Sequence, residues 1–357
     1  MKPNYPVAVG GGISQQAYEA RTRIQRKGVT RMLRAAGIEL ERLRTVVDLG
    51  CRNGDTTLGV LETVPKARVI GVEEHREALL IARAKFGMLT GQERDEIKGL
   101  GEMIEEVTSG WLGNFYANAK ATDLYRLSLV NSPLEHLPTV LGDEKADLIV
   151  GFQVLHWLNA DETGLPTMEV LKAIYDSLAA GGIFLAGTST AFIAIDPNEK
   201  IEGMTKAEYS IDNHPFVQMV YECIEDAVSA ILGYAPQPVL AKPPLSKEGL
   251  EMRLRNAGFA MVSSDAFLVT SGREEVIDNV VRLRPEHQGR LNGVDNPDER
   301  KRIIEDAIRF ANGICDQKVS GGEQDPRLVE TNIYDAVPFV IATRLESEKA
   351  RQAIQAA

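Results

Sequence analysis

Apolar and polar positions along the chain form two kinds of pattern, short apolar runs and longer stretches with a 3.6-residue period. The apolar runs predict strands at residues 46–48, 67–73, 127–130, 146–150, 183–187, 260–269 and 336–342. The periodic stretches predict helices at 14–36, 75–86, 166–178, 216–232, 246–257, 271–283 and 297–315. The run at 146–150 is apolar after Asp147, as expected for a central strand buried on both faces. The chain is therefore expected to have an α/β fold.

The stretch from Thr45 to Thr57, TVVDLGCRNGDTT, reads as a strand that feeds a helix through a glycine-bearing turn. Gly50 and Gly54 leave little side chain there, so backbone N–H groups at a helix N-terminus can approach a ligand closely. The next strand ends in Glu73, and a carboxylate at that place can accept two hydrogen bonds from a ribose diol. This unit predicts a nucleoside-binding site. The glycine spacing lacks the G-x-G-x-x-G pattern of dinucleotide sites, so a dinucleotide is not the expected ligand.

The order D-L-G-C-x-x-G, with a second acidic residue at the end of the next strand, resembles motif I of class I S-adenosyl-L-methionine (SAM) methyltransferases. The resemblance implies a Rossmann-like seven-stranded sheet with a mostly helical cap, and SAM as the cofactor. It also implies that the following residues bind the cofactor: Tyr18, Thr22, Asp48, Gly50, Cys51, Asn53, Gly54, Thr57, Glu73, Glu74, Asn131, Ser132, Pro133, Leu134, Gly151, Phe152 and Gln153.

Two further stretches resemble the SABATH methyltransferases, a plant group that mostly methylates carboxylic acids. Tyr18, Thr22 and Gln25 share one helix face and are similar to that family's S-Y-x-x-N-S-x-x-Q opening, and residues 155–158, Leu-His-Trp-Leu, are identical to its second motif. The resemblance implies that Gln25 and Trp157 hold the substrate carboxylate through an amide N–H and the indole N–H, with His156 beside them. It also implies that Ser132 bonds the adenine edge and that Pro133 or Leu134 covers the adenine face.

The residues alone leave other interpretations open for these positions. The polar helix face around Gln25 also fits a solvated surface, Trp157 also fits a core residue, and His156 also fits a histidine that caps a strand end. Arg52 and Asn53 replace two serines of the family motif, and residues 151–153 replace Ser-Ser-Tyr. The family's aromatic substrates are therefore not carried over to this chain.

The segment between the fifth strand and the next core helix is the expected substrate cap. Residues 190–244 are rich in proline and hold one apolar helix, and an insertion at this place lies over the cofactor mouth in this fold. The expected substrate-binding residues are Gln25, Gln153, His156, Trp157, Tyr209, His214, Phe216 and Met219, with Val220 and Tyr234 as further wall candidates.

The same patterns divide the chain into a core with insertions. The expected parts are an N-terminal helical segment over the active site (1–40), a SAM-binding core (41–190) with a helical insertion (91–122), a cap insertion (191–244), core (245–270), cap helices (271–335), the final core strand (336–345) and a tail (346–357). Pro338 suits an edge or the start of that last strand better than its centre.

Charge and composition narrow the classes of partner. A net charge of -11 lacks the basic footprint that nucleic-acid binding usually needs. No apolar run approaches the roughly 20 residues of a membrane span, and the N-terminus lacks a signal-peptide pattern, so we expect a cytoplasmic protein without a membrane partner. Cys51, Cys223 and Cys315 form neither a disulfide framework nor a metal motif, and the five histidines lie far apart, so no metal is expected.

These features predict carboxyl O-methylation of a small, largely apolar carboxylic acid. Such an acid, with a pKa of about 4, is ionised at neutral pH and needs no general base. One alternative is an N-, C- or other O-methyltransferase of a natural-product pathway, in which His156 gains a role as a base or hydrogen-bond partner. Another is a non-catalytic SAM-fold binding protein, which Arg52 supports because it is a bulky residue in the turn. A homodimer is implied by the family likeness only.

Overall fold

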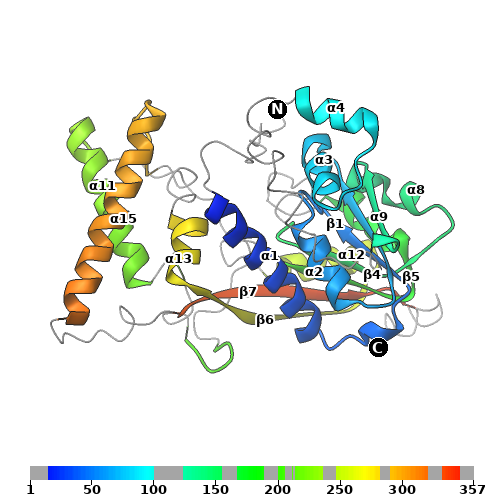
Figure 1. The fold of residues 1–357 in the computed structure, drawn as a ribbon. Coiled ribbons are helices and arrows are strands. Elements are labelled where there is room, and N and C mark those ends of the chain that lie inside the picture. The colour runs from blue at the N-terminus through cyan, green and yellow to red at the C-terminus, as the bar shows by residue number, and fades with distance from the viewer. Residues whose placement is uncertain are drawn as a thin grey trace.

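A seven-stranded sheet organises the chain (Figure 1). The computed structural model describes residues 15–99, 124–154, 167–188, 200–205, 211, 214–235, 247–281, 290–320 and 332–345. The strands are β1 (Thr45–Leu49), β2 (Arg68–Glu73), β3 (Leu127–Asn131), β4 (Ala146–Phe152), β5 (Leu178–Gly187), β6 (Ala260–Gly272) and β7 (Asn332–Thr343). Their order in the sheet is β3-β2-β1-β4-β5-β7-β6. β1 to β5 are parallel, and β7 is antiparallel to both of its neighbours. The predicted Rossmann-like fold class is confirmed.

The chain order reverses between β1 and β4, which pair at the centre of the sheet. Every residue of β1 is buried, and β4 is buried at all but one position. Ligands of open α/β sheets bind outside the carboxyl ends of the strands at such a reversal. The fold therefore places the candidate site at the residues that follow β1, β2 and β4.

Helices cover both faces of the sheet. Alternate residues of each strand point to opposite faces, so their contacts show which helices cover each face. On one face, α1 (Gln15–Ala35), α2 (Asp55–Thr63) and α3 (Arg76–Lys85) pack against Val46 and Val150. On the other face, α8 (Leu137–Leu141), α9 (Met168–Ser177) and α12 (Lys247–Ala257) pack against Val47 and Ile149. Neighbouring strand residues thus serve opposite layers, as a strand period of two requires.

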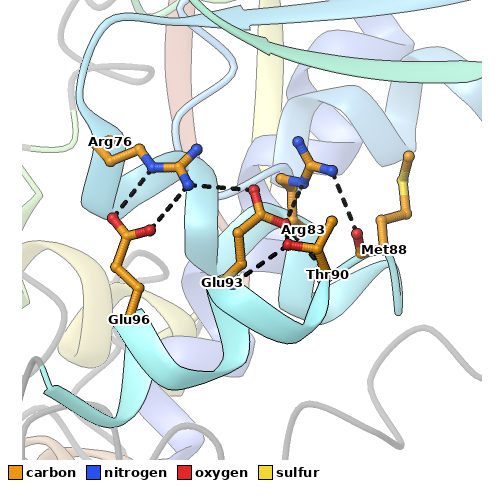
Figure 2. Close-up of polar contacts among 6 residues, drawn as sticks. All are labelled: Arg76, Arg83, Met88, Thr90, Glu93 and Glu96. Atoms are coloured by element: carbon orange, nitrogen blue, oxygen red, sulfur yellow. Dashed lines mark hydrogen bonds and ion pairs between the residues drawn. The ribbon is translucent and has the colours of Figure 1, made fainter.

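The short helix α4 (Gly91–Gly99) is tied to α3 by charged side chains (Figure 2). The backbone N–H of Thr90 donates to Glu93 Oε2 (2.9 Å), and the N–H of Glu93 donates to Thr90 Oγ1 (3.3 Å), which is a reciprocal cap of the helix start. The buried Glu93 carboxylate also pairs with Arg76 and with Arg83, each at 3.3 Å. The network fixes α4 to the helix that follows Glu73.

A second helical unit stands away from the sheet. Figure 1 shows α11 (Pro215–Leu232) and α15 (Pro297–Ser320) side by side, with α13 (Arg273–Val276) between them and the core. They share an apolar cluster with the π-helical turn η5 (Ile277–Val281). Two further short elements, η1 (Leu40–Arg42) and η2 (Leu134–His136), precede β1 and α8.

β6 and β7 extend further than the sequence predicts. The helix predicted from Ser271 begins at Arg273, and the strand predicted from Ala336 begins at Asn332, because the two strands pair with each other as far as Gly272 and Asn332. Pro338 lies inside β7 and not at a strand start. Pairing of β7 with β5 stops at Phe339, so Pro338 lies just beyond the last β5 pair and is tolerated there.

Candidate functional site

The turn between β1 and α2 is built by two glycines in the left-handed region. Gly50 has φ +68° and Gly54 has φ +86°, where other residues are strained. The N–H groups of Gly50 and Cys51 both donate to the carbonyl oxygen of Val72, at 2.9 and 3.1 Å. The start of the turn is thereby fixed to the next strand.

The same glycines make room for other parts of the protein. A Cβ at Gly50 would overlap Cγ2 of Val154, and a Cβ at Gly54 would lie 2.8 Å from the Phe86 ring. Cys51 is buried. Arg52 is exposed and Asn53 is partly exposed, so these two positions are the most accessible part of the turn.

Asp48 lies at the base of the turn with 1% of its surface exposed. Its Oδ2 accepts hydrogen bonds from the hydroxyls of Thr56 (2.8 Å) and Thr57 (2.6 Å), which are in the first turn of α2. Its Oδ1 is buried and accepts no hydrogen bond in the described part of the chain. Burial raises the pKa of Asp48 to about 6, although the two hydroxyl bonds act in the opposite direction.

Glu73, at the carboxyl end of β2, connects the turn to the neighbouring strand. Its Oε2 accepts the N–H of Arg52 (2.9 Å) and its Oε1 accepts the N–H of His75 (2.8 Å). Burial raises the pKa of Glu73, and these two backbone bonds partly offset that effect. The two carboxyl groups of Asp48 and Glu73 therefore flank one backbone turn in a largely water-excluded place.

The segment after β3 is fixed to the same part of the sheet, the carboxyl ends of β1, β2 and β4, which we call the corner. The N–H of Ser132 donates to the carbonyl oxygen of Glu73 (3.0 Å), and Asn131 Nδ2 donates to the carbonyl oxygens of Glu73 (2.8 Å) and Glu74 (3.0 Å). Leu134 is buried in the core, whereas Pro133 is exposed. Of the two residues predicted to cover an adenine face, Pro133 is the accessible one.

The end of β4 supplies the third side of the corner. Gly151 makes room for Val154, since a Cβ at Gly151 would lie 2.6 Å from Val154 Cγ1. Gln153 has φ +58°, and its N–H donates to the carbonyl oxygen of Gly187 (2.7 Å). Arg52, with φ +47°, and Gln153 are thus both strained non-glycine residues at the carboxyl ends of the strands. Such strain persists only where surrounding contacts hold it, and it clusters at functional sites.

Helix α1 passes over this corner. A Cβ at Gly28 would overlap the ring of Phe152, the last residue of β4, so the helix backbone lies directly on that ring. Gln25 is three residues earlier, on the same helix face, and is partly exposed. The helix therefore brings Gln25 to the region of the β4 carboxyl end. Tyr18 and Thr22 belong to α1, but their side chains lie outside the described residues, as do His156, Trp157 and Tyr209.

The close approach at Gly28 gives a testable expectation. Gly28→Ala should lower the free energy of unfolding by about 1–2 kcal/mol, because overpacking against Phe152 outweighs the better helix propensity of alanine. Gly313 in α15 has open space around its Cα, so Gly313→Ala should raise the free energy of unfolding by about 0.5–1 kcal/mol. Urea unfolding of both variants measures the contrast. Equal effects would contradict the close packing.

The predicted wall residues on α11 have different environments. Phe216 and Val220 are fully buried in the cluster that joins α11 to α15, so the structure gives them a packing role. Met219 is partly exposed and Tyr234 is exposed. His214 caps the start of α11, where its Nδ1 accepts the N–H of Phe216 (3.3 Å). Their roles toward a substrate stay predictions.

An open hollow of about 570 Å³ lies at the opposite edge of the sheet, where β1, β2 and β3 begin. Two of the basic side chains that line it form ion pairs. Arg68 pairs with Glu144 (2.6 Å), and Lys66 pairs with Glu41 (3.2 Å). Ligands of this fold bind at the other edge, so we assign no ligand to the hollow.

Among the described residues, no group of three or more His, Cys, Asp or Glu residues is placed to hold a metal ion. Within the same residues, no helix has both the length and the apolar character that a membrane crossing needs.

Several contributors to the corner were not predicted from the sequence. Val154, which fills the space beside Gly50 and Gly151, and the buried pair Asp55 and Lys85 carry no recognisable signal. Gly28 does carry one, because an isolated glycine inside a helical pattern often marks a close approach.

No family model matches the sequence, and no curated protein matches it. Among solved structures, the chain is similar to the YcgJ protein of Bacillus subtilis, with 13% identity over 88% of this chain and 97% of that one, and a TM-score of 0.40. It is similar to a SAM-dependent methyltransferase from Archaeoglobus fulgidus, with 14% identity over 89% of this chain and 94% of that one, and a TM-score of 0.38.

A third similar structure is phosphoethanolamine N-methyltransferase 2 of Haemonchus contortus in complex with S-adenosyl-L-methionine. Its identity is 11% over 89% of this chain and 52% of that one, and its TM-score is 0.38. At these TM-scores the similarities carry no argument about function, which depends on the chain's own residues. Membership of the SABATH family stays a prediction from the motifs.

Proposed function

We propose that this chain is a SAM-dependent methyltransferase. The observation that carries the proposal is the pair of buried carboxyl groups, Asp48 and Glu73, at the carboxyl ends of adjacent strands, with the Arg52 N–H held by Glu73. The order of the strands reverses between β1 and β4, which is where ligands of such sheets bind. The arrangement therefore suits a nucleoside at Glu73 and a small charged group beside the turn.

The residues present fit the cofactor chemically. Each Glu73 oxygen accepts one backbone N–H and keeps a further lone pair, so the carboxylate can accept the two hydroxyls of a ribose. Asp48 Oδ1, which accepts no hydrogen bond in the described part of the chain, suits an ammonium group such as that of the methionine part of SAM. Bound SAM supplies a methyl group on a positively charged sulfur.

The acceptor we propose is a small, largely apolar carboxylic acid, held by Gln25 and Trp157. Support comes from Gly28, which seats α1 on Phe152 and so brings Gln25 toward the end of β4. Trp157 follows that strand by five residues in the sequence. A carboxylate is already ionised at neutral pH, so the chain's residues need only orient it in line with the methyl group, at about 3 Å, and exclude water.

Transfer of radiolabelled methyl from SAM to a panel of small carboxylic acids tests the proposal. The product is expected to be a base-labile ester, and Gln25→Ala or Trp157→Phe is expected to lower turnover about tenfold with little change in SAM affinity. Asp176→Ala, exposed near the end of α9 and at the opposite edge of the sheet, is the control and should leave turnover unchanged. A base-stable product would indicate an N- or C-methyltransferase instead. Absence of binding by both SAM and S-adenosylhomocysteine would leave a non-catalytic binding protein.

A further inference from the structure

A fully buried ion pair lies directly behind the candidate cofactor turn. Lys85 Nζ is 2.6 Å from Asp55 Oδ1, and the two side chains are 0% and 5% exposed. Asp55 is the first residue of α2, immediately after Gly54, and Lys85 is the last residue of α3. The pair therefore connects the end of the turn to the helix that follows Glu73.

The last part of α3 contacts the turn at a second point. A Cβ at Gly54 would lie 2.8 Å from the Phe86 ring and 3.2 Å from Cβ of Ala82. Apolar packing at Gly54 and a charge pair one residue later together fix the direction in which α2 starts. The other end of α3 follows Glu73 and is tied to α4 by Arg76 (Figure 2).

Stability alone does not account for this pair. A buried ion pair loses much of its attraction to desolvation, and apolar side chains of similar volume often stabilise a protein as well or better. An ion pair differs from an apolar contact because it fixes the relative orientation of the two side chains and balances their charges. Asp55 sits at the positive end of the α2 dipole, where an unpaired carboxylate would repel an anionic ligand, and Lys85 neutralises that carboxylate.

We propose that Lys85 and Asp55 are positioning residues for the cofactor turn. The pair holds residues 50–54 in the conformation seen here and keeps the N-terminus of α2 attractive to an anionic group such as the carboxylate of SAM. This inference rests on the proposed SAM-binding function. Both side chains are buried, so they act through the turn and not by touching a ligand.

The double variant Asp55→Asn/Lys85→Met separates positioning from stability, because it removes both charges at nearly constant volume. Its melting temperature is expected to stay close to that of the wild type, while its Kd for S-adenosylhomocysteine, measured by calorimetry, rises about tenfold. The single variant Lys85→Met removes the cation beside the buried Asp55 carboxylate and is expected to lose both stability and affinity.

Arg126→Met is the matched control, because Arg126 is a buried cation that contacts the other end of α2, away from the turn. The buried Arg126 donates to the carbonyl oxygens of Leu61 (3.2 Å), Val64 (2.9 Å) and Ala67 (2.6 Å). Its loss should destabilise the fold without changing the Kd for S-adenosylhomocysteine. Wild-type affinity in the double variant would overturn the positioning role.

A ligand-free measurement keeps the two proposals distinguishable. Amide hydrogen exchange at residues 50–54 is expected to be about tenfold faster in the double variant than in the wild type. Unchanged exchange would overturn the positioning role even if SAM does not bind. Absent binding in the wild type would instead refute the proposed function.

Discussion

Replacing Asp48 by asparagine is expected to raise the free energy of unfolding by about 2 kcal/mol at pH 8 and to change it little at pH 4. Burial raises the pKa of this carboxyl group from 3.8 to about 6 in the folded chain, so the folded state holds the proton more tightly than the unfolded state. The protonated form of Asp48 therefore stabilises the folded state. This stabilisation is fully present below pH 3.8 and is lost as the pH rises through about 6.

The size of the expected gain follows from the same shift. Keeping Asp48 ionised in the folded chain costs about 3 kcal/mol at high pH. Asparagine carries no charge, and its oxygen can still accept from Thr56 and Thr57, but its amide group would occupy the place of Oδ1, which has no partner in the described residues. The unmet amide offsets about 1 kcal/mol of the gain.

Urea unfolding at pH 4 and pH 8 measures the effect. Asp147→Asn is the matched control, because Asp147 Oδ2 accepts two backbone N–H groups, from Arg44 (2.7 Å) and Thr45 (3.0 Å), at the opposite edge of the sheet. It should show no gain at pH 8. A lack of pH dependence in Asp48→Asn would mean that the carboxyl group is not held in the environment seen here.

The sheet could be predicted from the sequence because its signal is local. Val46 and Val47 belong to a short apolar run, and such a run needs helices on both faces whatever the rest of the chain does. The D-L-G-C-x-x-G turn and Glu73 were predicted for a similar reason, since residue type and spacing along one βαβ unit carry the chemistry. The structure places these residues at one corner.

What could not be predicted depends on contacts between distant segments. Ser271 reads as a helix start, but β7 pairs with it and extends the strand to Gly272. Phe216 reads as a pocket wall, and its burial depends on α15, which the local pattern does not specify. The sequence predicts that Gly50 leaves space for a ligand. In the structure Val154, which follows β4, fills part of that space.

Glu73→Ala is expected to weaken the binding of SAM and S-adenosylhomocysteine about 100-fold or more. Two hydrogen bonds from a ribose to a carboxylate are worth about 1.5–3 kcal/mol each, and every 1.4 kcal/mol is a factor of ten in Kd. The variant also leaves the N–H groups of Arg52 and His75 without their acceptor, so the turn loses its connection to β2. Calorimetry with either ligand measures the loss. Glu144→Ala is the control, since Glu144 is a carboxylate with two partners, Thr45 and Arg68, at the far edge of the sheet.

The pH dependence of binding separates the charge of Glu73 from its shape. Burial raises the pKa of Glu73, so the wild type is expected to lose affinity as the pH falls through that raised value, which is above the range of an exposed glutamate. Glu73→Gln keeps the volume and one acceptor oxygen but cannot ionise. Its affinity at neutral pH should be lower than that of the wild type, and the pH dependence that remains in the variant, near pH 6, should belong to Asp48. If the Gln variant kept wild-type affinity at neutral pH, the ionised state of Glu73 would not contribute to binding, and the proposed role of its charge would be wrong.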